Sequence, residues 1–296
     1  YLFILKFPYL ILDILIAFLL TGLFTEIQVK KRVFIFWLFN PFSIAILYMY
    51  SNVDIFPTFL VVLSLYFFKR CKIVFSALML GLGAAFKAYP LLLVPFLFLK
   101  AQTLKEKILV IILSFGTFFL SILPFINSVA FRQSTLTSGL TTRIVSSGLD
   151  IGFGEILMPT IILLSILFFW RKGGFGIELW RYYLVVFVLI FISIHFHIQW
   201  LLWFMPMFAM IYAVGSRDEI NLSIYFLLIA FLIPILYTDK SMTVGLLSVI
   251  SPVYDLLPMP STALAKFYDP KVVEGVLHSG LFGLGLVLSF RLMNNK

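Results

Sequence analysis

The side chains of this chain that could take part in chemistry are few, and they stand out because their neighbours are mostly apolar. Acidic groups occur at Asp13 and Asp54, and Lys87 interrupts another apolar run. A charged side chain inside a membrane segment is costly, so each of these residues is a functional hypothesis by default. We expect an anionic partner for Lys87, which is Asp13, Asp54 or the phosphate of a ligand.

Both acidic residues also have a structural interpretation. Asp54 comes three residues before Pro57, a spacing that suits a carboxylate at the N-terminus of a helix. Asp13 could pair with Lys6 or with a polar group on a neighbouring helix. The sequence leaves both interpretations open beside the functional one.

A second group of polar residues lies between two apolar runs near the middle of the chain. It contains His195, His197 and Gln199, and the first and last of these are spaced to share one face of a helix. A zinc site would need a third ligand nearby, so we expect no metal site, and nothing supports a divalent cation. Arg132 and Arg143 lie in a polar segment, where they bind a phosphate or are simply solvated.

The composition places these residues in a membrane protein. Of 296 residues, 62% are hydrophobic and 12% are charged, whereas soluble domains have about 45–50% apolar and about 25% charged residues. This composition excludes a disordered chain, a nucleic-acid-binding module and an ordinary cytosolic enzyme. The single cysteine, Cys71, excludes an internal disulfide. The net charge of +9 then reflects basic cytoplasmic loops.

We predict an all-α, polytopic bundle of about ten or eleven membrane segments, forming one domain over residues 1–296. The predicted spans are 8–24, 33–50, 55–68, 73–86, 91–99, 108–124, 155–170, 182–196, 199–215, 220–237 and 276–292, with long outer segments at 125–154 and 238–275.

Basic residues set the topology. If the first span runs inward, most of the 22 basic residues fall on the cytoplasmic side. Residues 69–72 and 100–107 are both basic, so 73–99 must enter the membrane and return as a short hairpin. We place its turn at Lys87 to Pro90, because proline disfavours helix at the preceding residue. The alternative is one long helix with Lys87 in the middle of the membrane.

This topology brings the polar residues to one side. Asp13, Asp54, Lys87 and the turn 195–199 all fall in the exoplasmic half of the bundle. We therefore predict a water-filled pocket there, with Asp54 and Lys87 near its base.

Five short motifs follow one another along the chain. They are LKFP at 5–8 followed by LDIL at 12–15, FWLFNP at 36–41, NVD at 52–54, GAAFKAYP at 83–90, and QWLLWFMP at 199–206. In this order they resemble motifs of the GT-C superfamily of integral-membrane glycosyltransferases. Within it they are similar to the PIG-M mannosyltransferases and to bacterial and archaeal polyprenyl-phosphate-mannose enzymes.

The resemblance implies a hexosyltransferase, most similar to mannosyltransferases of glycolipid biosynthesis. Such enzymes move a sugar from a polyprenyl- or dolichyl-phosphate carrier to a glycan or glycolipid acceptor on the outer or lumenal face. They are multi-pass proteins of the bacterial or archaeal plasma membrane or of the endoplasmic reticulum. Membrane lipid and a small membrane subunit are further expected partners. A transporter of lipid-linked oligosaccharides and a non-catalytic subunit of a glycosylation complex are the alternatives.

The resemblance also implies roles for single residues. The leaving phosphate needs a cation, for which we expect Lys87, with Arg132 or Arg143. The acceptor hydroxyl needs a carboxylate within hydrogen-bond reach, and the family's base lies in a first outer loop that we expect upstream of Tyr1, so Asp54 only assists. The other expected substrate-binding residues are Asp13, Asn52, Tyr89, His195, His197 and Gln199. No covalently bound cofactor is expected.

Overall fold

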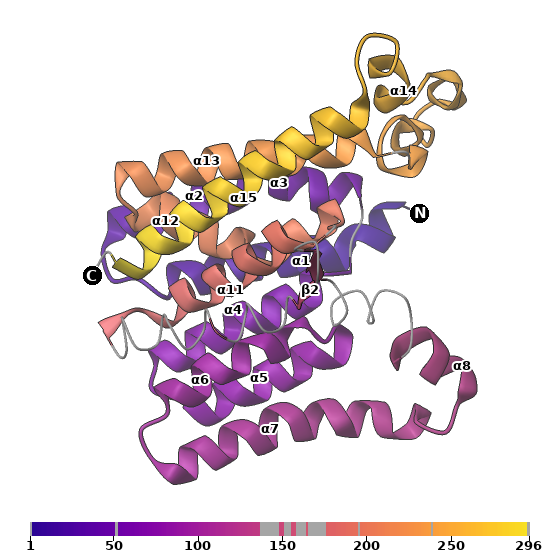
Figure 1. Ribbon diagram of the computed structural model, residues 1–296. Helices are drawn as coiled ribbons and strands as arrows, with labels where there is room; N and C mark the ends of the chain where they lie inside the picture. Colours follow the sequence, from indigo (N-terminus) through magenta and orange to yellow (C-terminus); the bar gives the residue numbers. More distant parts are fainter. Residues whose placement is uncertain are drawn as a thin grey trace.

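The computed structural model describes residues 2–50, 53–136, 148–150, 155–157, 164, 176–194, 196–237 and 239–294. In this part the chain is a bundle of helices that lie side by side (Figure 1). The predicted all-α class is confirmed. The strands are confined to a small antiparallel hairpin of β1 (Gly148–Asp150) and β2 (Glu155–Leu157) within the described part of the chain.

The α-helices are α1 (Leu2–Thr21), α2 (Ile27–Leu38), α3 (Pro41–Ile44), α4 (Ile55–Lys69), α5 (Ile73–Phe86), α6 (Val94–Lys100), α7 (Leu104–Ile122), α8 (Val129–Phe131), α11 (Leu179–Ser193), α12 (Met205–Val214), α13 (Arg217–Leu232), α14 (Pro260–Leu264) and α15 (Pro270–Asn294). The 3₁₀ helices are η2 (Tyr89–Leu93), η3 (Leu123–Phe125), η6 (Ile198–Trp203), η7 (Ile233–Leu236), η8 (Lys240–Met242), η9 (Val244–Leu247) and η10 (Pro252–Leu256), and the π-helical turns are η1 (Ala45–Met49) and η4 (Arg132–Leu136).

Four helical stretches in the described residues are long and apolar enough to cross a membrane. They are Ile27–Met49, Leu104–Phe125, Arg217–Leu236 and Pro270–Asn294. Five shorter apolar helices, of 10–17 residues, accompany them. The chain is therefore an integral membrane protein, in which short helices are combined with full-length spans.

The centre of the bundle is the short helix α11. It is buried along nearly its whole length, whereas α7 buries only Val110 and Ser114. A helix that is apolar on all sides belongs either inside a protein or against lipid. Accordingly α11 fills the core, and α7 presents most of its apolar surface outward.

The predicted hairpin over 73–99 is present. Helix α5 ends at Phe86, and η2 and α6 return the chain toward the level at which α5 began. Two basic ends show this directly, because Lys69 Nζ lies 3.4 Å from Glu178 Oε1 and Lys100 Nζ donates to the Ile177 carbonyl at 2.6 Å. The two ends thus contact adjacent residues, Glu178 and Ile177, and the alternative of one long helix is excluded.

Three predicted spans differ in detail. The span 33–50 is broken, because Asn40 accepts a hydrogen bond from the Phe42 amide at 2.9 Å and so starts α3 anew at Pro41. The span 199–215 begins as the 3₁₀ helix η6 and becomes α-helical only at Met205. The helix predicted over 155–170 is wrong at its start, where 155–157 form β2, and most of its remainder lies outside the described residues.

The arm α5 lies very close to α7 because of a glycine. A Cβ added at Gly81 would lie 2.6 Å from the Ser114 carbonyl oxygen and 2.7 Å from that of Leu113. The Ser114 hydroxyl donates across the same contact to the Ala77 carbonyl at 3.0 Å. A small residue at such a contact lets two helix backbones approach closely.

We expect Gly81→Ala to lower the free energy of unfolding by about 1–3 kcal/mol, because backbone oxygens would have to move apart. Gly116→Ala on α7 is the matched control, since an added Cβ there meets nothing within 4 Å. Unfolding of both variants in mixed micelles, followed by circular dichroism, measures the difference. Equal effects at the two positions would contradict the close packing.

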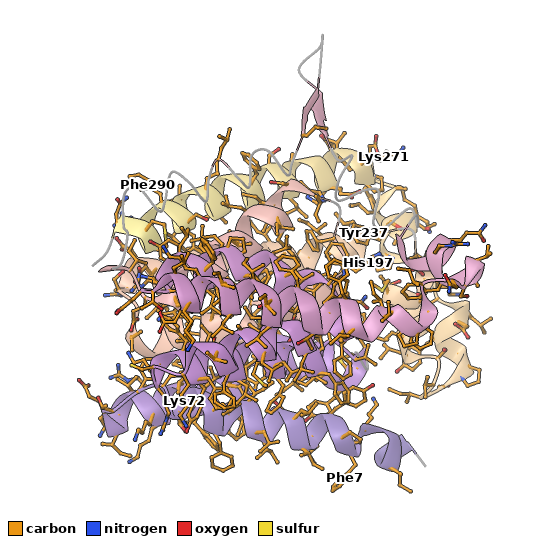
Figure 2. The ribbon with its side chains drawn as sticks, turned by 90° about the horizontal axis from the view of Figure 1, so that it is seen from below. Phe7, Lys72, His197, Tyr237, Lys271 and Phe290 are labelled. Carbon is orange, nitrogen blue, oxygen red and sulfur yellow. The ribbon has the colours of Figure 1, made fainter. Side chains whose placement is uncertain are left out.

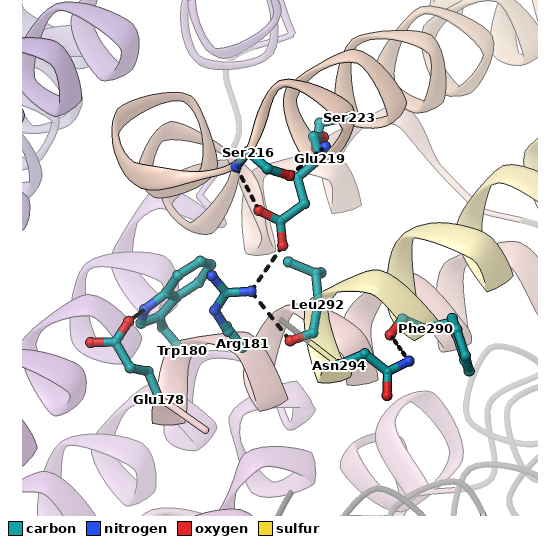
Figure 3. A network of polar contacts seen from close by, with 9 residues as sticks. All are labelled: Glu178, Trp180, Arg181, Ser216, Glu219, Ser223, Phe290, Leu292 and Asn294. Atoms are coloured by element: carbon teal, nitrogen blue, oxygen red, sulfur yellow. Dashed lines mark hydrogen bonds and ion pairs between the residues drawn. The ribbon is translucent and has the colours of Figure 1, made fainter. Parts of the chain in front are cut away.

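At the end of the bundle that holds the C-terminus, a buried ion pair joins three helices (Figure 3). Arg181 Nη1 of α11 lies 2.9 Å from Glu219 Oε1 of α13 and donates to the Leu292 carbonyl of α15 at 3.2 Å. Glu219 also accepts from the Ser216 amide at 2.8 Å, as part of a capping box that begins α13. This contact holds the ends of three helices at one level.

We expect Arg181→Met to cost about 3–5 kcal/mol of unfolding free energy, because it leaves the Glu219 carboxylate buried without its cation. The exposed pair of Arg291 with Asp218, 3.2 Å apart, provides the control. Arg291→Met should cost about 0–1 kcal/mol, since solvent screens that pair. Thermal unfolding of both variants in detergent tests this, and similar losses would show that the buried contact is not special.

Candidate functional site

The candidate site lies at the opposite end of the bundle, where three short segments meet. Asp54 directly precedes α4, Lys87 directly follows α5, and η6 carries Trp200 and Trp203. Because α4 and α5 run in opposite directions, the start of one lies beside the end of the other. The hairpin topology therefore brings Asp54 and Lys87 together.

Lys87 and Asp54 form a two-pronged ion pair. The lysine Nζ lies 3.0 Å from Oδ1 and 2.8 Å from Oδ2 of the aspartate. Trp203 Nε1 donates to the same Oδ2 at 2.8 Å. The Asp54 side chain is 2% exposed, but that of Lys87 is 32% exposed. A buried carboxylate thus holds the ammonium in one place while the ammonium remains accessible from outside the bundle.

This geometry settles the two interpretations of Asp54. The residue stands at the N-terminus of α4, but its side chain makes no capping hydrogen bond there. The carboxylate points to Lys87 and Trp203 instead. The capping interpretation is wrong, and Asp54 rather than Asp13 is the partner of Lys87.

Aromatic rings form a wall behind the ion pair. Trp203 stacks on Tyr89, with centroids 4.2 Å apart, and on Trp200, with centroids 5.0 Å apart. Lys87 Nζ lies 5.0 Å from the Trp203 centroid and 5.9 Å from that of Trp200, within the range of a cation–π contact. Tyr89 is buried and its hydroxyl lies 3.2 Å from Thr58 Oγ1. The tyrosine therefore supports Trp203.

Sequence reasoning missed the two tryptophans as site residues. In a 3₁₀ helix, side chains three residues apart eclipse each other, so Trp200 and Trp203 of η6 stack face to face. In an α-helix, as predicted over 199–215, residues three apart are offset by about 60° around the helix axis and do not eclipse each other. Their spacing of three within the QWLLW run was the available signal.

Local sequence also explains where Lys87 emerges. The backbone leaves the helical conformation at Lys87, with φ −158° and ψ 130°. The 3₁₀ helix η2 then follows, with Pro90 in its first turn. A Cβ at Gly83 would lie 3.2 Å from Pro90 Cγ, so the glycine lets the returning chain pack closely on α5.

Asp13 belongs to a different polar cluster. Its carboxylate accepts from the Tyr48 hydroxyl at 2.8 Å, and its carbonyl accepts from Trp37 Nε1 at 3.0 Å. Lys6 donates to the Tyr48 carbonyl, so the predicted link between Lys6 and Asp13 runs through a tyrosine. These contacts tie α1 to α2 and η1. Binding of substrate by Asp13 stays a prediction.

Of the remaining candidate residues, the structure describes some and leaves others outside the described part of the chain. His197 precedes η6, and its ring lies 5.9 Å from that of Trp200. Gln199 lies within η6, and Arg132 is exposed at the start of η4. The candidates Asn52, Arg143 and His195 lie outside the described residues.

A cleft of about 580 Å³ lies beyond His197, and neither Asp54 nor Lys87 lines it. It is therefore not the predicted pocket, which would have these two residues near its base. Figure 2 shows His197, Tyr237 and Lys271 at one end of the molecule, with Lys72 and Phe290 at the other. Hydrogen bonds from the hydroxyl and amide of Ser241 hold the pKa of Asp239, another lining residue, below its usual range, and His197 has a smaller effect of the same sign.

Among the residues that the structure describes, no three histidine, cysteine or acidic side chains are grouped to hold a metal ion.

Comparison with known proteins relates part of the chain to a known family. The family model for mannosyltransferase (PIG-M) matches residues 49–148, a stretch that contains Asp54, Lys87 and Tyr89. No curated protein and no solved structure matches the chain. The resemblance to PIG-M mannosyltransferases is confirmed over the matched residues, and it supports a glycosyltransferase of the mannosyltransferase type.

We expect Trp203→Phe to cost about 1–3 kcal/mol more than a control, because it leaves the buried Asp54 carboxylate without one donor. The control is Trp180→Phe, which removes a similar indole donor, 2.6 Å from Glu178 Oε2, where the carboxylate is 50% exposed. Unfolding of both variants in detergent gives the difference. A smaller loss in Trp203→Phe than in the control would contradict the role of the indole N–H.

Proposed function

We propose that this chain, whose residues 49–148 match the PIG-M mannosyltransferase family, transfers mannose from a polyprenyl- or dolichyl-phosphate carrier to a glycan or glycolipid acceptor. The observation that carries the proposal is the ion pair of Lys87 with Asp54. It presents an accessible ammonium, fixed by a buried carboxylate, at the ends of apolar helices.

The ammonium suits a phosphate as leaving group. A lysine ammonium has three N–H donors, and the Asp54 carboxylate takes two of them. The exposure of Lys87 allows a third contact, to a phosphate oxygen. A fixed cation beside the oxygen on which negative charge develops lowers the barrier without reorganisation.

The depth of the site suits a lipid-borne donor. Asp54 and Lys87 lie at the ends of the apolar helices α4 and α5. An isoprenoid chain in the bilayer would deliver its phosphate at this level. This arrangement favours a polyprenyl-type carrier as the donor.

In the proposed reaction, the acceptor hydroxyl oxygen attacks the anomeric carbon of mannose. The bond from that carbon to the phosphate oxygen breaks, and the phosphate leaves with the electron pair beside Lys87. Asp54 is 2% exposed and is occupied by Lys87 and Trp203, so we assign it a positioning role. The proton of the hydroxyl then passes to another base, which the family resemblance places in the first outer loop.

The distribution of charge supports a site on the outer or lumenal face. Lys69 and Lys100 both lie at the end of the bundle away from Lys87, next to residues 177–178. Lys72 also lies at the end opposite His197 (Figure 2). Since basic residues accumulate on the cytoplasmic side, we infer that the site faces the exoplasmic side of a plasma membrane or the lumen of the endoplasmic reticulum.

The test is mannosyl transfer by the complete protein, with its first outer loop, in proteoliposomes supplied with radiolabelled polyprenyl-phosphate mannose and membrane lipid extract as acceptor. We expect Lys87→Ala to lower kcat by about 10²–10³-fold, as loss of one fixed electrostatic contact does in other enzymes. Lys69→Ala, at the other end of the bundle, should leave the rate unchanged.

A double variant tests the positioning role of Asp54. If Asp54 acts through Lys87, Asp54→Asn should reduce kcat, and adding it to Lys87→Ala should cause little further loss. Thermal unfolding of each variant separates loss of activity from loss of fold. Normal transfer by Lys87→Ala, or fully additive losses, would overturn the assignment.

A further inference from the structure

The cleft beyond His197 has the features of a carbohydrate site. We propose that it binds the sugar head group of the acceptor, an uncharged or positively charged carbohydrate, next to the donor phosphate at Lys87. This inference rests on the proposed function and deepens it. The residues that carry it are His197, Tyr237, Asp239, Ser261, Lys271 and Glu274, all of which line the cleft.

The cleft is connected to the ion pair by a short series of contacts. The His197 ring lies 5.9 Å from Trp200, and Trp200 stacks on Trp203, whose indole donates to Asp54. On another side, the Tyr50 hydroxyl donates to the carbonyl of Met242, a cleft residue, at 3.0 Å. A sugar in the cleft would therefore lie one side chain away from the wall that positions Lys87.

An unpaired hydroxyl in the wall of the cleft points to a ligand. Ser261 is 5% exposed, and its Oγ has no hydrogen-bond partner among the residues that the structure describes. A buried polar group without a partner costs free energy, and such groups are rare in folded proteins. A hydroxyl of a bound sugar would supply the missing partner.

Carboxylates in the cleft are already oriented but keep acceptor capacity. Asp239 Oδ1 accepts from the amide and hydroxyl of Ser241 at 2.9 and 2.7 Å. Glu274 Oε1 lies 3.7 Å from His278 Nε2. A carboxylate has about four lone-pair sites, so each can also accept hydrogen bonds from sugar hydroxyls.

The charge of the cleft limits what it can hold. Three residues with carboxylates, Asp239, Asp269 and Glu274, line the cleft together with one lysine, Lys271. Their excess negative charge opposes an anionic ligand and tolerates a neutral or cationic one. Phosphate and sugar are thus separated by charge, with the donor phosphate at Lys87 and the acceptor sugar in the cleft.

The position of the cleft suits an acceptor anchored in lipid. Tyr237 follows the membrane helix Arg217–Leu236, and Pro270 begins the membrane helix Pro270–Asn294. The cleft therefore lies at the level where two spans end. Head groups of membrane lipids occupy this level, so we assign the cleft to the head group of a glycolipid.

Binding of simple glycosides to the full chain in nanodiscs tests the proposal without any need for turnover. Octyl α-D-mannoside should bind, as measured by saturation-transfer NMR, and Ser261→Ala should weaken it by about two- to tenfold, the effect of one hydrogen bond. Ser289→Ala is the matched control, because Ser289 is also buried with an unpartnered hydroxyl but does not line the cleft. The unfolding temperature of Ser261→Ala should not fall.

Two further ligands test whether the cleft disfavours an anionic sugar and whether it favours a sugar that carries a lipid chain. Octyl β-D-glucuronide, which is anionic, should bind more weakly than the mannoside, and methyl α-D-mannoside should bind more weakly than the octyl compound. Equal binding of the glucuronide, or unchanged binding to Ser261→Ala, would overturn the sugar site. Equal binding of the methyl compound would overturn the assignment to a glycolipid.

The transfer assay separates this inference from the proposed function. If both hold, Ser261→Ala raises KM for the acceptor and leaves KM for the donor unchanged. If the cleft does not bind the acceptor, transfer continues with both constants unchanged. If the proposed function fails, the natural sequence transfers no mannose although the mannoside still binds in the cleft.

Discussion

The end of the bundle that carries the candidate site depends on one buried carboxylate. Asp54 is almost completely removed from solvent, and an ionised carboxylate in an apolar interior is stable only when donors surround it. Lys87 and Trp203 provide those donors, and each comes from a different part of the chain. To satisfy Asp54, the end of α5 and the helix η6 must both lie against the start of α4. The same contacts leave the lysine accessible.

The aromatic wall follows from the choice of helix type. In the 3₁₀ helix η6, residues three apart eclipse each other, so Trp200 and Trp203 stack. One face of the wall contacts Lys87, and the side of Trp200 meets His197 at the cleft. A change of about 20° per residue in helical twist, from an α-helix to a 3₁₀ helix, thus joins the place proposed for the phosphate to the place proposed for the acceptor sugar. At the other end of the molecule, the contact of Arg181 with Glu219 and the Leu292 carbonyl holds three helices at one level.

The basic residues alone were enough to predict that the segment 73–99 forms a hairpin of two short arms. Lysines at 69 and at 100 had to lie on one side, so the segment between them had to return, and Lys87 had to lie near Asp54 at the far end. Sequence reasoning could not choose among the partners of Lys87 or exclude the capping role of Asp54. Both questions turn on the direction of a side chain, and sequence spacing does not report that direction when the partner lies 33 positions away.

Composition and charge thus decided that the chain is a helical membrane bundle and that Asp54 and Lys87 lie at the same end of it, because the cost of placing charge in lipid acts on every segment independently. Packing between distant segments decided the rest. It separated Asp13 from the site by giving it Tyr48, recruited two tryptophans, and formed the cleft from parts of the chain that lie between His197 and Glu274. These features depend on contacts between residues far apart in the chain, and such contacts exist only once the helices have assembled.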